Sequence, residues 1–329
     1  MLRGTAEYWA SRVEAHKGHG GAVDGLLHIN HVMPPDEYVD GVDDAVLTNF
    51  GAQAILRKAA QAAVAAGRQP GSNWTAVADK IFVNFDKHKQ YHPEYAGFIP
   101  NVLAPPDVRN GGGSKLVKQA DVVLIGFPYD SNMSAAVRKN DLEIYYNCTS
   151  KTSVAMTWGM FAVGWLEVAQ QEKDAKEHAK AQALAEKTFL QGYSNIKPPF
   201  GVWTETPTGG TVNFITGAGG FMQSVIFGYA GLRLREERLD LLQPPLPRGT
   251  ASLTLRGLHY RGNKLLLQVG AARVAVQVME QTAADAAGAG KVALDLCLPE
   301  GKSVPLRLGK APTLFVRGIV ASIRPAGTC

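Results

Sequence analysis

The stretch TNFGAQAILRKAAQAAVAAG, residues 48–67, gives the clearest structural signal in the chain. Its apolar side chains, among them Ala52, Leu56 and Ala59, recur every three or four residues, which is the spacing of an amphipathic helix. A threonine that can cap the first turn opens the stretch, and a glycine that can end a helix closes it. The stretch therefore predicts an α-helix and a helical first part of the chain.

Similar helical patterns continue on the C-terminal side of this stretch. Helices are predicted over residues 72–83, 134–146, 154–168, 172–190 and 221–229. Long connections rich in Pro, Gly, Asn and Tyr separate them, and the longest covers residues 86–115. Connections of this length inside a domain often carry functional residues. Paired helices joined by long loops suit a helical barrel with its site on one rim.

The pattern changes after Arg233. A stretch with Pro244, Pro245 and Pro247 resembles a linker. Beyond it, period-two alternation predicts strands over residues 252–260, 264–269, 273–279, 292–298 and 313–319. The sequence therefore predicts a mainly α protein with two domains: a helical domain over residues 1–232 and a small antiparallel β-domain over residues 233–329.

The composition limits the classes of partner. The 329 residues are 46% hydrophobic and 19% charged, which is ordinary for a globular protein, and the net charge of +5 is spread without a basic cluster. Nucleic-acid binding is therefore not expected. No apolar stretch is long enough to span a membrane, and the N-terminus has no secretory signal. We therefore expect a cytoplasmic protein that does not bind a membrane.

Residue spacing argues against several kinds of site. Cys148, Cys297 and Cys329 are far apart and odd in number, which argues against a disulfide framework and a zinc knuckle. The eight histidines show no metal-ligand spacing. The glycine-rich residues 209–220 lack the ending of a phosphate-binding loop, and the sequence has no nucleophile elbow. We therefore expect neither a metal nor a cofactor.

An acidic segment, HVMPPDEYVDGVDDAVLTN over residues 31–49, contains the first candidate for catalysis. Two prolines give it a stiff entry, and Glu37 follows among aspartates at positions 36, 40, 43 and 44. Carboxyl groups that crowd together raise one another's pKa, and a carboxyl that stays protonated at neutral pH can act as a general acid. The alternative is a solvated acidic turn that caps the helix beginning near residue 48.

Two further segments carry groups suited to a sugar. Glu205 lies near Trp203 in a region rich in Gly and Pro, where a carboxylate and an aromatic ring can face a sugar together. Lys118 and Gln119 offer hydrogen-bond donors and an acceptor for sugar hydroxyls, ahead of an apolar run. The alternatives are a surface glutamate beside a packed tryptophan and an ordinary polar entry to a buried segment.

In this order the segments resemble glycoside hydrolase family 65. VMPPDEY (32–38) with GVDDAVLTN (41–49), KQADVVLIGFP (118–128) and TGAGGFMQSVIFGYAGLRL (216–234) are similar to blocks of that family. The resemblance covers residues 5–270 and implies an (α/α)6 barrel of six helical hairpins, followed by a small β-domain. Family members carry a β-sandwich and the first barrel helices before this region. We therefore expect an incomplete toroid in a chain that begins inside the barrel.

The resemblance also implies roles for single residues. Glu37 takes the place of the general acid, and Lys118 and Gln119 match the pair that holds the glucosyl unit of the substrate. The sequence departs from the family at Val39, where a histidine is usual, and at Asp43-Asp44, where two asparagines are usual. Both departures alter the surroundings of the predicted acid.

The family contains hydrolases and phosphorylases, and two features favour a hydrolase. Residues 149–158, TSKTSVAMTW, lack the histidine and paired serines with which phosphorylases bind phosphate. Glu205 stands where the hydrolases place the base that activates water. The resemblance therefore implies an inverting α-glucosidase that removes glucose from a glucosyl-galactosyl-hydroxylysine unit of collagen-type chains. The alternatives are a disaccharide phosphorylase of the trehalose, kojibiose or maltose type and an inactive carbohydrate-binding remnant.

Overall fold

The structure, a computed structural model, describes residues 1–15, 25–100, 116–152, 154–282 and 290–329. Residues 101–115 of the long predicted loop lie outside these ranges. The chain divides into two compact units: unit 1 comprises residues 1–164 and 192–218, and unit 2 comprises residues 165–191 and 219–329. Unit 2 therefore holds helical segments as well as strands, and the predicted domain boundary at residue 232 stays a prediction.

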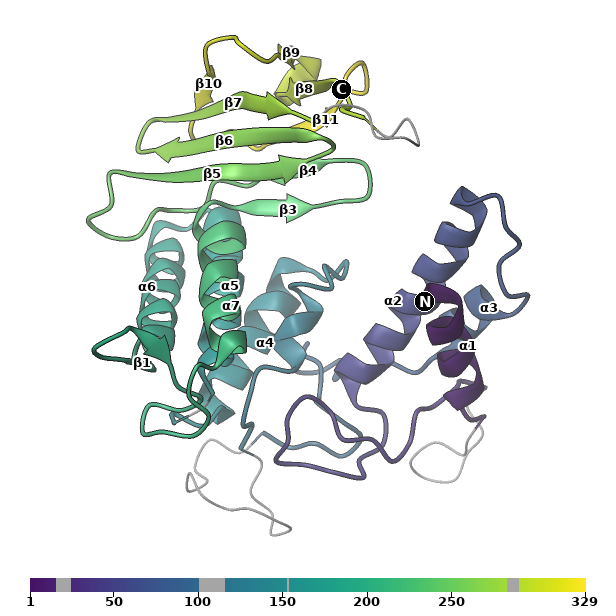
Figure 1. Cartoon of the computed structure of the whole chain (residues 1–329). Helices are drawn as coiled ribbons and strands as arrows, with labels where there is room; N and C mark the ends of the chain where they lie inside the picture. The colour runs from purple at the N-terminus through teal and green to yellow at the C-terminus, as the bar shows by residue number, and fades with distance from the viewer. Residues whose placement is uncertain (16–24, 101–115, 153, 283–289) are drawn as a thin grey trace. The chain divides into compact units, whose positions relative to one another are not determined.

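Three helices in unit 1 pack on one another (Figure 1). They are α1 (Leu2–Arg12), α2 (Val46–Ala65) and α3 (Trp74–Lys80). Ala6, Leu56 and Trp74, one from each helix, are buried in a single apolar cluster together with Ile29 from the connecting loop. α2 confirms the helix predicted over residues 48–67, and the burial of one of its faces explains its three- and four-residue spacing.

The other elements of unit 1 include helix α4 (Ala135–Cys148). This helix begins where the sequence predicts, because the Ser134 hydroxyl caps it by accepting a hydrogen bond from the Val137 N–H. Unit 1 also includes the 3₁₀ helix η1 (Val122–Ile125), the strands β1 (Ile196–Lys197) and β2 (Val202–Trp203), and part of α5 (Ala155–Gln171). The Arg138 guanidinium donates to the Val123 carbonyl at 2.7 Å, which fastens η1 to α4.

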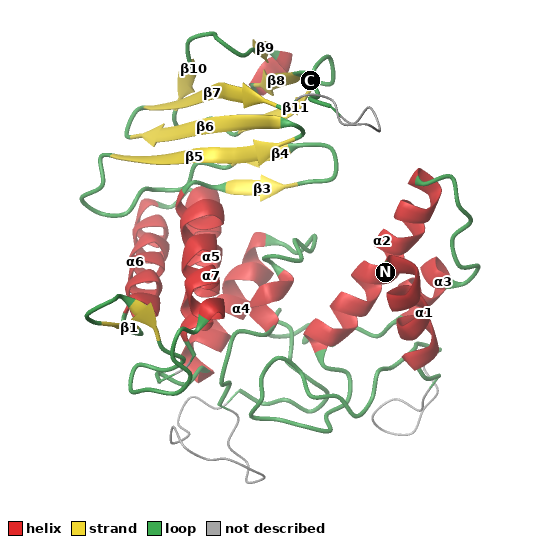
Figure 2. Ribbon diagram, viewed as in Figure 1, coloured by secondary structure: helices red, strands yellow, loops and turns green. Residues whose placement is uncertain are grey.

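Unit 2 combines helical segments with two antiparallel sheets (Figure 2). Its helical segments come from α5, α6 (Ala175–Tyr193), α7 (Ile215–Gln223), the π-helix η2 (Ser224–Tyr229) and the 3₁₀ helix η3 (Pro299–Gly301). One sheet has the order β10-β7-β6-β5 and the other β3-β4-β11-β8-β9. The strands are β3 (Leu232–Leu234), β4 (Leu239–Leu241), β5 (Ser252–Tyr260), β6 (Asn263–Gly270), β7 (Arg273–Gln281), β8 (Leu294–Cys297), β9 (Ser303–Leu306), β10 (Thr313–Val316) and β11 (Ala321–Pro325).

Both sheets contribute to one apolar core. Leu265, Leu267 and Val269 on β6 are buried and alternate with more exposed residues, and they share this core with Leu296 and Ile323 of the other sheet. The alternation confirms the antiparallel β-structure predicted for this part of the chain. β3, β4, β9 and β11 are not predicted, whereas β8 and β10 lie inside the predicted ranges 292–298 and 313–319.

The structure corrects the expectation about cysteines. Cys297, the last residue of β8, forms a disulfide with Cys329 across a Cα–Cα distance of 5.4 Å, while Cys148 is buried and free. The two cysteines are 32 positions apart, so the sequence does not show the pair. In the fold the chain returns to β8 through β11, which is hydrogen-bonded to β8. Because disulfides are typical of oxidising compartments, the cytoplasmic location stays only a prediction.

Helices contain more residues than strands in the described part of the chain, in line with the mainly α class that the sequence predicts. Among the same residues, no helix is both long and apolar enough to cross a lipid bilayer. The incomplete (α/α)6 toroid stays a prediction.

Candidate functional site

The acidic segment before α2 forms an irregular loop whose carboxylates have separate partners. Asp44 is buried and pairs with His28, with 2.7 Å between Oδ2 and Nδ1. Asp43 accepts a hydrogen bond from the backbone N–H of His31 at 3.0 Å. Two of the aspartates thus hold the loop in shape.

Asp36 ties the acidic segment to the segment that contains Lys118 and Gln119. Its Oδ1 accepts hydrogen bonds from the backbone N–H groups of Lys118 at 2.7 Å and Tyr38 at 3.2 Å. The side-chain amide of Gln119 donates to the Pro35 carbonyl. These contacts fix the backbone on both sides of Glu37's loop, although the two segments are 82 residues apart in sequence.

Lys118 contacts both predicted catalytic carboxylates. Its ammonium group forms an ion pair with Glu37 Oε2 and lies 3.9 Å from Glu205 Oε1. The Glu37 side chain is 54% exposed, whereas those of Lys118 and Glu205 are 23% and 27% exposed. Three residues that are far apart in sequence thus form one cluster within unit 1, with Glu37 open to solvent.

A tight loop and α5 hold Glu205. Its backbone N–H donates to the Thr211 carbonyl at 2.9 Å, and its carbonyl accepts from the Ala155 N–H at 2.9 Å. The Thr211 N–H also donates to Glu205 Oε2 at 3.3 Å. Gly210 has a φ of +83°, and a β-carbon there would lie 2.9 Å from Glu205 Oε2. The loop therefore needs glycine at this position and leaves the carboxylate little room to turn.

Trp203 lies on β2, two residues before Glu205, and is half-buried. Its ring meets Tyr193 edge-on, with 6.2 Å between the ring centroids. The Phe214 N–H donates to the Trp203 carbonyl at 2.8 Å. The ring thus packs the β1–β2 hairpin against its neighbours, and its contact with a sugar stays a prediction.

The shared ammonium limits the distance between the two carboxylates. The two ion pairs to one nitrogen keep the paired oxygens within about 6 Å of each other. Retaining glycosidases hold their carboxyl groups about 5–5.5 Å apart, and inverting ones about 6.5–9.5 Å apart. A limit of about 6 Å for the paired oxygens lies between these two ranges, so the stereochemistry is tested on the product.

Sequence reasoning misses two buried carboxyl groups beside this cluster, Glu94 and Asp121. They are 1% and 2% exposed, and Asp36 is 1% exposed. Burial raises the pKa of Asp36 to about 6. Burial and the charge of Asp36 raise the pKa of Asp121 to about 7, and burial with both aspartate charges raises the pKa of Glu94. The sequence offers one signal for each of them. Glu94 is a lone acidic residue in the aromatic motif YHPEY, and Asp121 is a lone acidic residue before the apolar run in ADVVLI.

Residues 149–158 correspond to the segment compared above with the phosphate-binding loop of phosphorylases. Two of their hydroxyl groups form hydrogen bonds within the protein. The Thr149 hydroxyl donates to the Tyr145 carbonyl, and the Thr157 hydroxyl accepts from the Ala120 N–H at 3.0 Å. Ser153 lies outside the described residues. Thr149 therefore bonds within the end of α4, and Thr157 joins α5 to the segment that carries Lys118 and Gln119.

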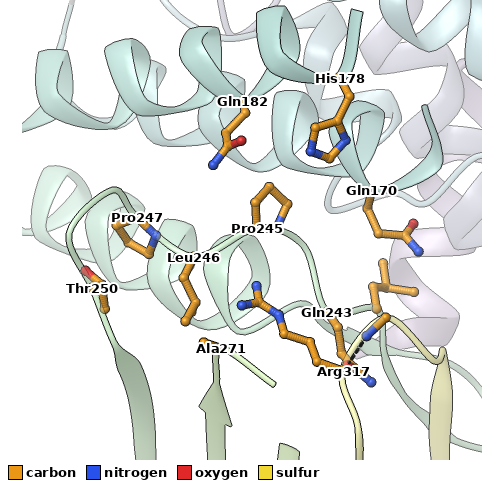
Figure 3. A pocket seen from close by; sticks show the side chains of 12 residues that line it. Gln170, His178, Gln182, Gln243, Pro245, Leu246, Pro247, Thr250, Ala271 and Arg317 are labelled. Atoms are coloured by element: carbon orange, nitrogen blue, oxygen red, sulfur yellow. Dashed lines mark hydrogen bonds between the residues drawn. The ribbon is translucent and has the colours of Figure 1, made fainter. Parts of the chain in front are cut away.

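Two cavities in the described part of the chain lie away from the predicted carboxylates. In unit 2, a cavity of about 530 Å³ is lined by Gln170, His178, Gln182 and Arg317 among others (Figure 3). In unit 1, a cavity of about 310 Å³ is lined by His92 and its neighbours. No Asp or Glu lines either cavity, so neither contains the carboxylate pair that glycoside cleavage uses.

Comparison with known proteins relates the chain to glycosidases. Residues 1–107 match the family model of the glycosyl hydrolase family 65 central catalytic domain. The chain is 37% identical over 332 residues to a protein-glucosylgalactosylhydroxylysine glucosidase of Danio rerio, which covers 100% of the chain and 45% of that protein. It is 40% identical over 266 residues to the protein of the same name from Dictyostelium discoideum, which covers 80% of the chain and 33% of that protein.

More distant matches agree with this relationship. The chain is 30% identical over 260 residues to a kojibiose hydrolase of Mucilaginibacter mallensis, over 78% of the chain and 34% of that protein. A solved structure named "Putative kojibiose phosphorylase from human microbiome" shares the fold, with a TM-score of 0.65 and 15% identity over 96% of the chain and 45% of that structure. The chain thus spans less than half the length of these relatives. From these matches we conclude that the chain belongs to glycosyl hydrolase family 65.

Proposed function

We propose that the protein carrying this chain is an inverting α-glucosidase that removes glucose from a glucosyl-galactosyl unit on hydroxylysine of collagen-type chains. The observation that carries the proposal is the position of Lys118, whose ammonium group meets the carboxylates of both Glu37 and Glu205. The names of the relatives that are 37% and 40% identical support the choice of substrate.

Glu37 and Glu205 divide the proton transfers of the reaction. Glu37, which is the more exposed, donates a proton to the oxygen that leaves with galactose. Glu205, held by its loop, takes a proton from a water molecule that attacks the anomeric carbon from the opposite face. The product of this single displacement is β-glucose.

The other predicted residues bind the glucosyl unit. The ammonium of Lys118 donates hydrogen bonds to sugar hydroxyls, and Gln119, whose amide donates to Pro35, accepts one through its carbonyl oxygen. Trp203 offers an aromatic face to the sugar ring. In this proposal residues 1–232 form the later part of an (α/α)6 toroid, and residues 233–329 form its accessory β-domain.

Substitution of the two glutamates tests these roles. In the protein that carries this chain, Glu37→Gln and Glu205→Gln should each lower kcat for α-1,2-glucosyl-galactose by about 10²–10⁴-fold, the usual contribution of a general acid or base. Glu7→Gln, at an exposed glutamate of α1, is the matched control and should leave kcat unchanged. Near wild-type turnover by either site variant would refute the role assigned to that residue.

The stereochemistry and the acceptor are tested on the product. NMR of the first product should show β-glucose, and α-glucose would rule out inversion. Activity that depends on inorganic phosphate and releases β-glucose 1-phosphate would replace the hydrolase with a phosphorylase.

A further inference from the structure

Three carboxyl groups beside the proposed catalytic cluster form a buried group of their own. Asp36, Glu94 and Asp121 are each at most 2% exposed. No hydrogen bond of normal geometry from a described residue reaches the side-chain oxygens of Glu94 or Asp121. We call these three residues the acid triad.

The surroundings of Glu94 favour a protonated carboxyl at this position of the acid triad. A buried carboxylate without hydrogen-bond donors raises the free energy of the folded state, and three negative charges close together raise it further. Protonation lowers this free energy. Burial, followed by the charges of Asp121 and Asp36, raises the pKa of Glu94, which can then donate its proton to either aspartate. One carboxyl proton therefore joins acidic residues that would otherwise repel one another.

The surroundings of the acid triad supply few compensating charges. Burial and then the charge of Glu94 raise the pKa values of the Tyr95 phenol and the Cys148 thiol, and the same two causes act on the Tyr145 phenol. These three groups are therefore neutral. The Lys118 backbone N–H, which donates to Asp36, lowers the pKa of the Asp36 carboxyl. The charge of the Lys118 ammonium group lowers it by less.

The acid triad is connected to the segments that carry the proposed catalytic groups. Asp36 immediately precedes Glu37 and accepts hydrogen bonds from the Lys118 and Tyr38 backbone N–H groups at 2.7 Å and 3.2 Å. The carbonyl of Glu94 accepts a hydrogen bond from the first residue of α2 at 2.7 Å. A change in Glu94 therefore reaches the proposed acid through Asp36.

We propose that Glu94 is a positioning residue: its carboxyl proton joins Asp36 to Asp121 and so holds Glu37 where it can protonate the leaving group. This role rests on the proposed function, because it concerns delivery of the Glu37 proton. Without a donor at position 94, the negative charges of Asp36 and Asp121 face each other. Asp36 then turns away, releases the Lys118 N–H and displaces the neighbouring Glu37.

Two substrates separate positioning of the acid from general damage. The leaving group of α-1,2-glucosyl-galactose is galactose, which departs as an alcohol and needs a proton from Glu37. The leaving group of α-glucosyl fluoride is fluoride ion, which needs no general acid. Glu94→Met and Glu94→Ala remove the donor, and Glu94→Gln keeps one in its amide N–H. Asp295→Asn, at a buried carboxyl of unit 2, is the matched control.

The non-donor variants should lose kcat/KM on the disaccharide by about 10²-fold, as expected for a misplaced catalytic group, and by less than about fivefold on the fluoride. Glu94→Gln should keep both values within about threefold of wild type, because its amide still donates. Equal losses on both substrates would overturn the proposal. So would failure of both non-donor variants to fold, since Glu94 would then support the fold rather than the acid.

The same assay separates this proposal from the proposed function. Glu37→Gln should lose activity on the disaccharide and retain activity on the fluoride. If the wild-type protein cleaves neither substrate, the proposed function fails. If Glu37→Gln is selective and Glu94→Met is not, only the positioning role fails.

Discussion

In the acidic segment, burial is the main cause of the raised pKa of Asp36. Asp36 is 1% exposed, and its pKa rises to about 6. The backbone N–H groups of Lys118 and Tyr38 donate to Asp36 and lower its pKa, but they do not outweigh burial. The neighbours of a residue in space therefore set its chemistry.

The raised pKa values predict how the stability of unit 1 depends on pH. The folded-state pKa values of about 6 for Asp36 and about 7 for Asp121 lie above the ordinary value of 3.8. The folded state then binds more protons than the unfolded state between these values. The free energy of unfolding should fall as the pH rises through about 4 to 7, by up to about 1.4 kcal/mol per pH unit for each proton.

Thermal melting of two variants checks this dependence. Asp121→Asn removes one titrating group, so its melting temperature should fall less between pH 5 and pH 8 than that of the wild type. Asp295→Asn, in unit 2, should keep the wild-type slope. A wild-type slope in Asp121→Asn would contradict protonation of the buried aspartate.

At the scale of elements, the loop over residues 206–211 positions Glu205. The Thr206 N–H donates to the Gly209 carbonyl at 2.9 Å, and the Glu205 N–H donates to the Thr211 carbonyl at 2.9 Å. These bonds fold residues 206–211 back against Glu205, which precedes them in the sequence. The site thus depends on backbone geometry in a region without regular secondary structure, where side-chain periodicity has no predictive value.

Gly210→Ala tests the loop. An added β-carbon would lie 2.9 Å from Glu205 Oε2 and 3.0 Å from Glu205 Cβ, at a φ of +83° that alanine adopts poorly. The displaced carboxylate should lower kcat by about 10-fold or more. Gly219→Ala is the control, because a β-carbon there has no neighbour within 4 Å. Equal kcat values for the two variants would show that the loop does not hold Glu205.

At the scale of the whole molecule, the chain builds two units with separate apolar clusters. Ala6, Leu56 and Trp74 are buried in a cluster of unit 1, whereas the two sheets enclose the core of unit 2. The disulfide Cys297–Cys329 belongs to unit 2 alone. A change in one unit can therefore lower the free energy of unfolding of that unit alone.

Reduction of the disulfide should destabilise unit 2 and leave unit 1 unchanged. A crosslink that closes a loop of 32 residues restricts the unfolded chain and stabilises the folded one by about 3–4 kcal/mol. Cys329→Ser should therefore lower the free energy of unfolding as much as a reductant does, and the reductant should have no further effect on this variant. Cys148→Ser keeps the disulfide and its response to the reductant. Equal stability with and without reductant would argue against the bond.

The sequence by itself determined the periodic elements and the motifs. The helix in residues 48–67 and the alternating strands of residues 252–279 follow from spacing within one segment, and Glu37, Lys118 and Glu205 are singled out by motif. Such signals are local, so one segment is enough to show them. Only the tertiary structure decided that one ammonium meets two distant carboxylates, that Glu94 is buried close to Asp36 and Asp121, and that Cys297 meets Cys329. The physical reason is that these contacts depend on where the folded chain returns to itself, and their energies come from burial and charge that no single segment contains.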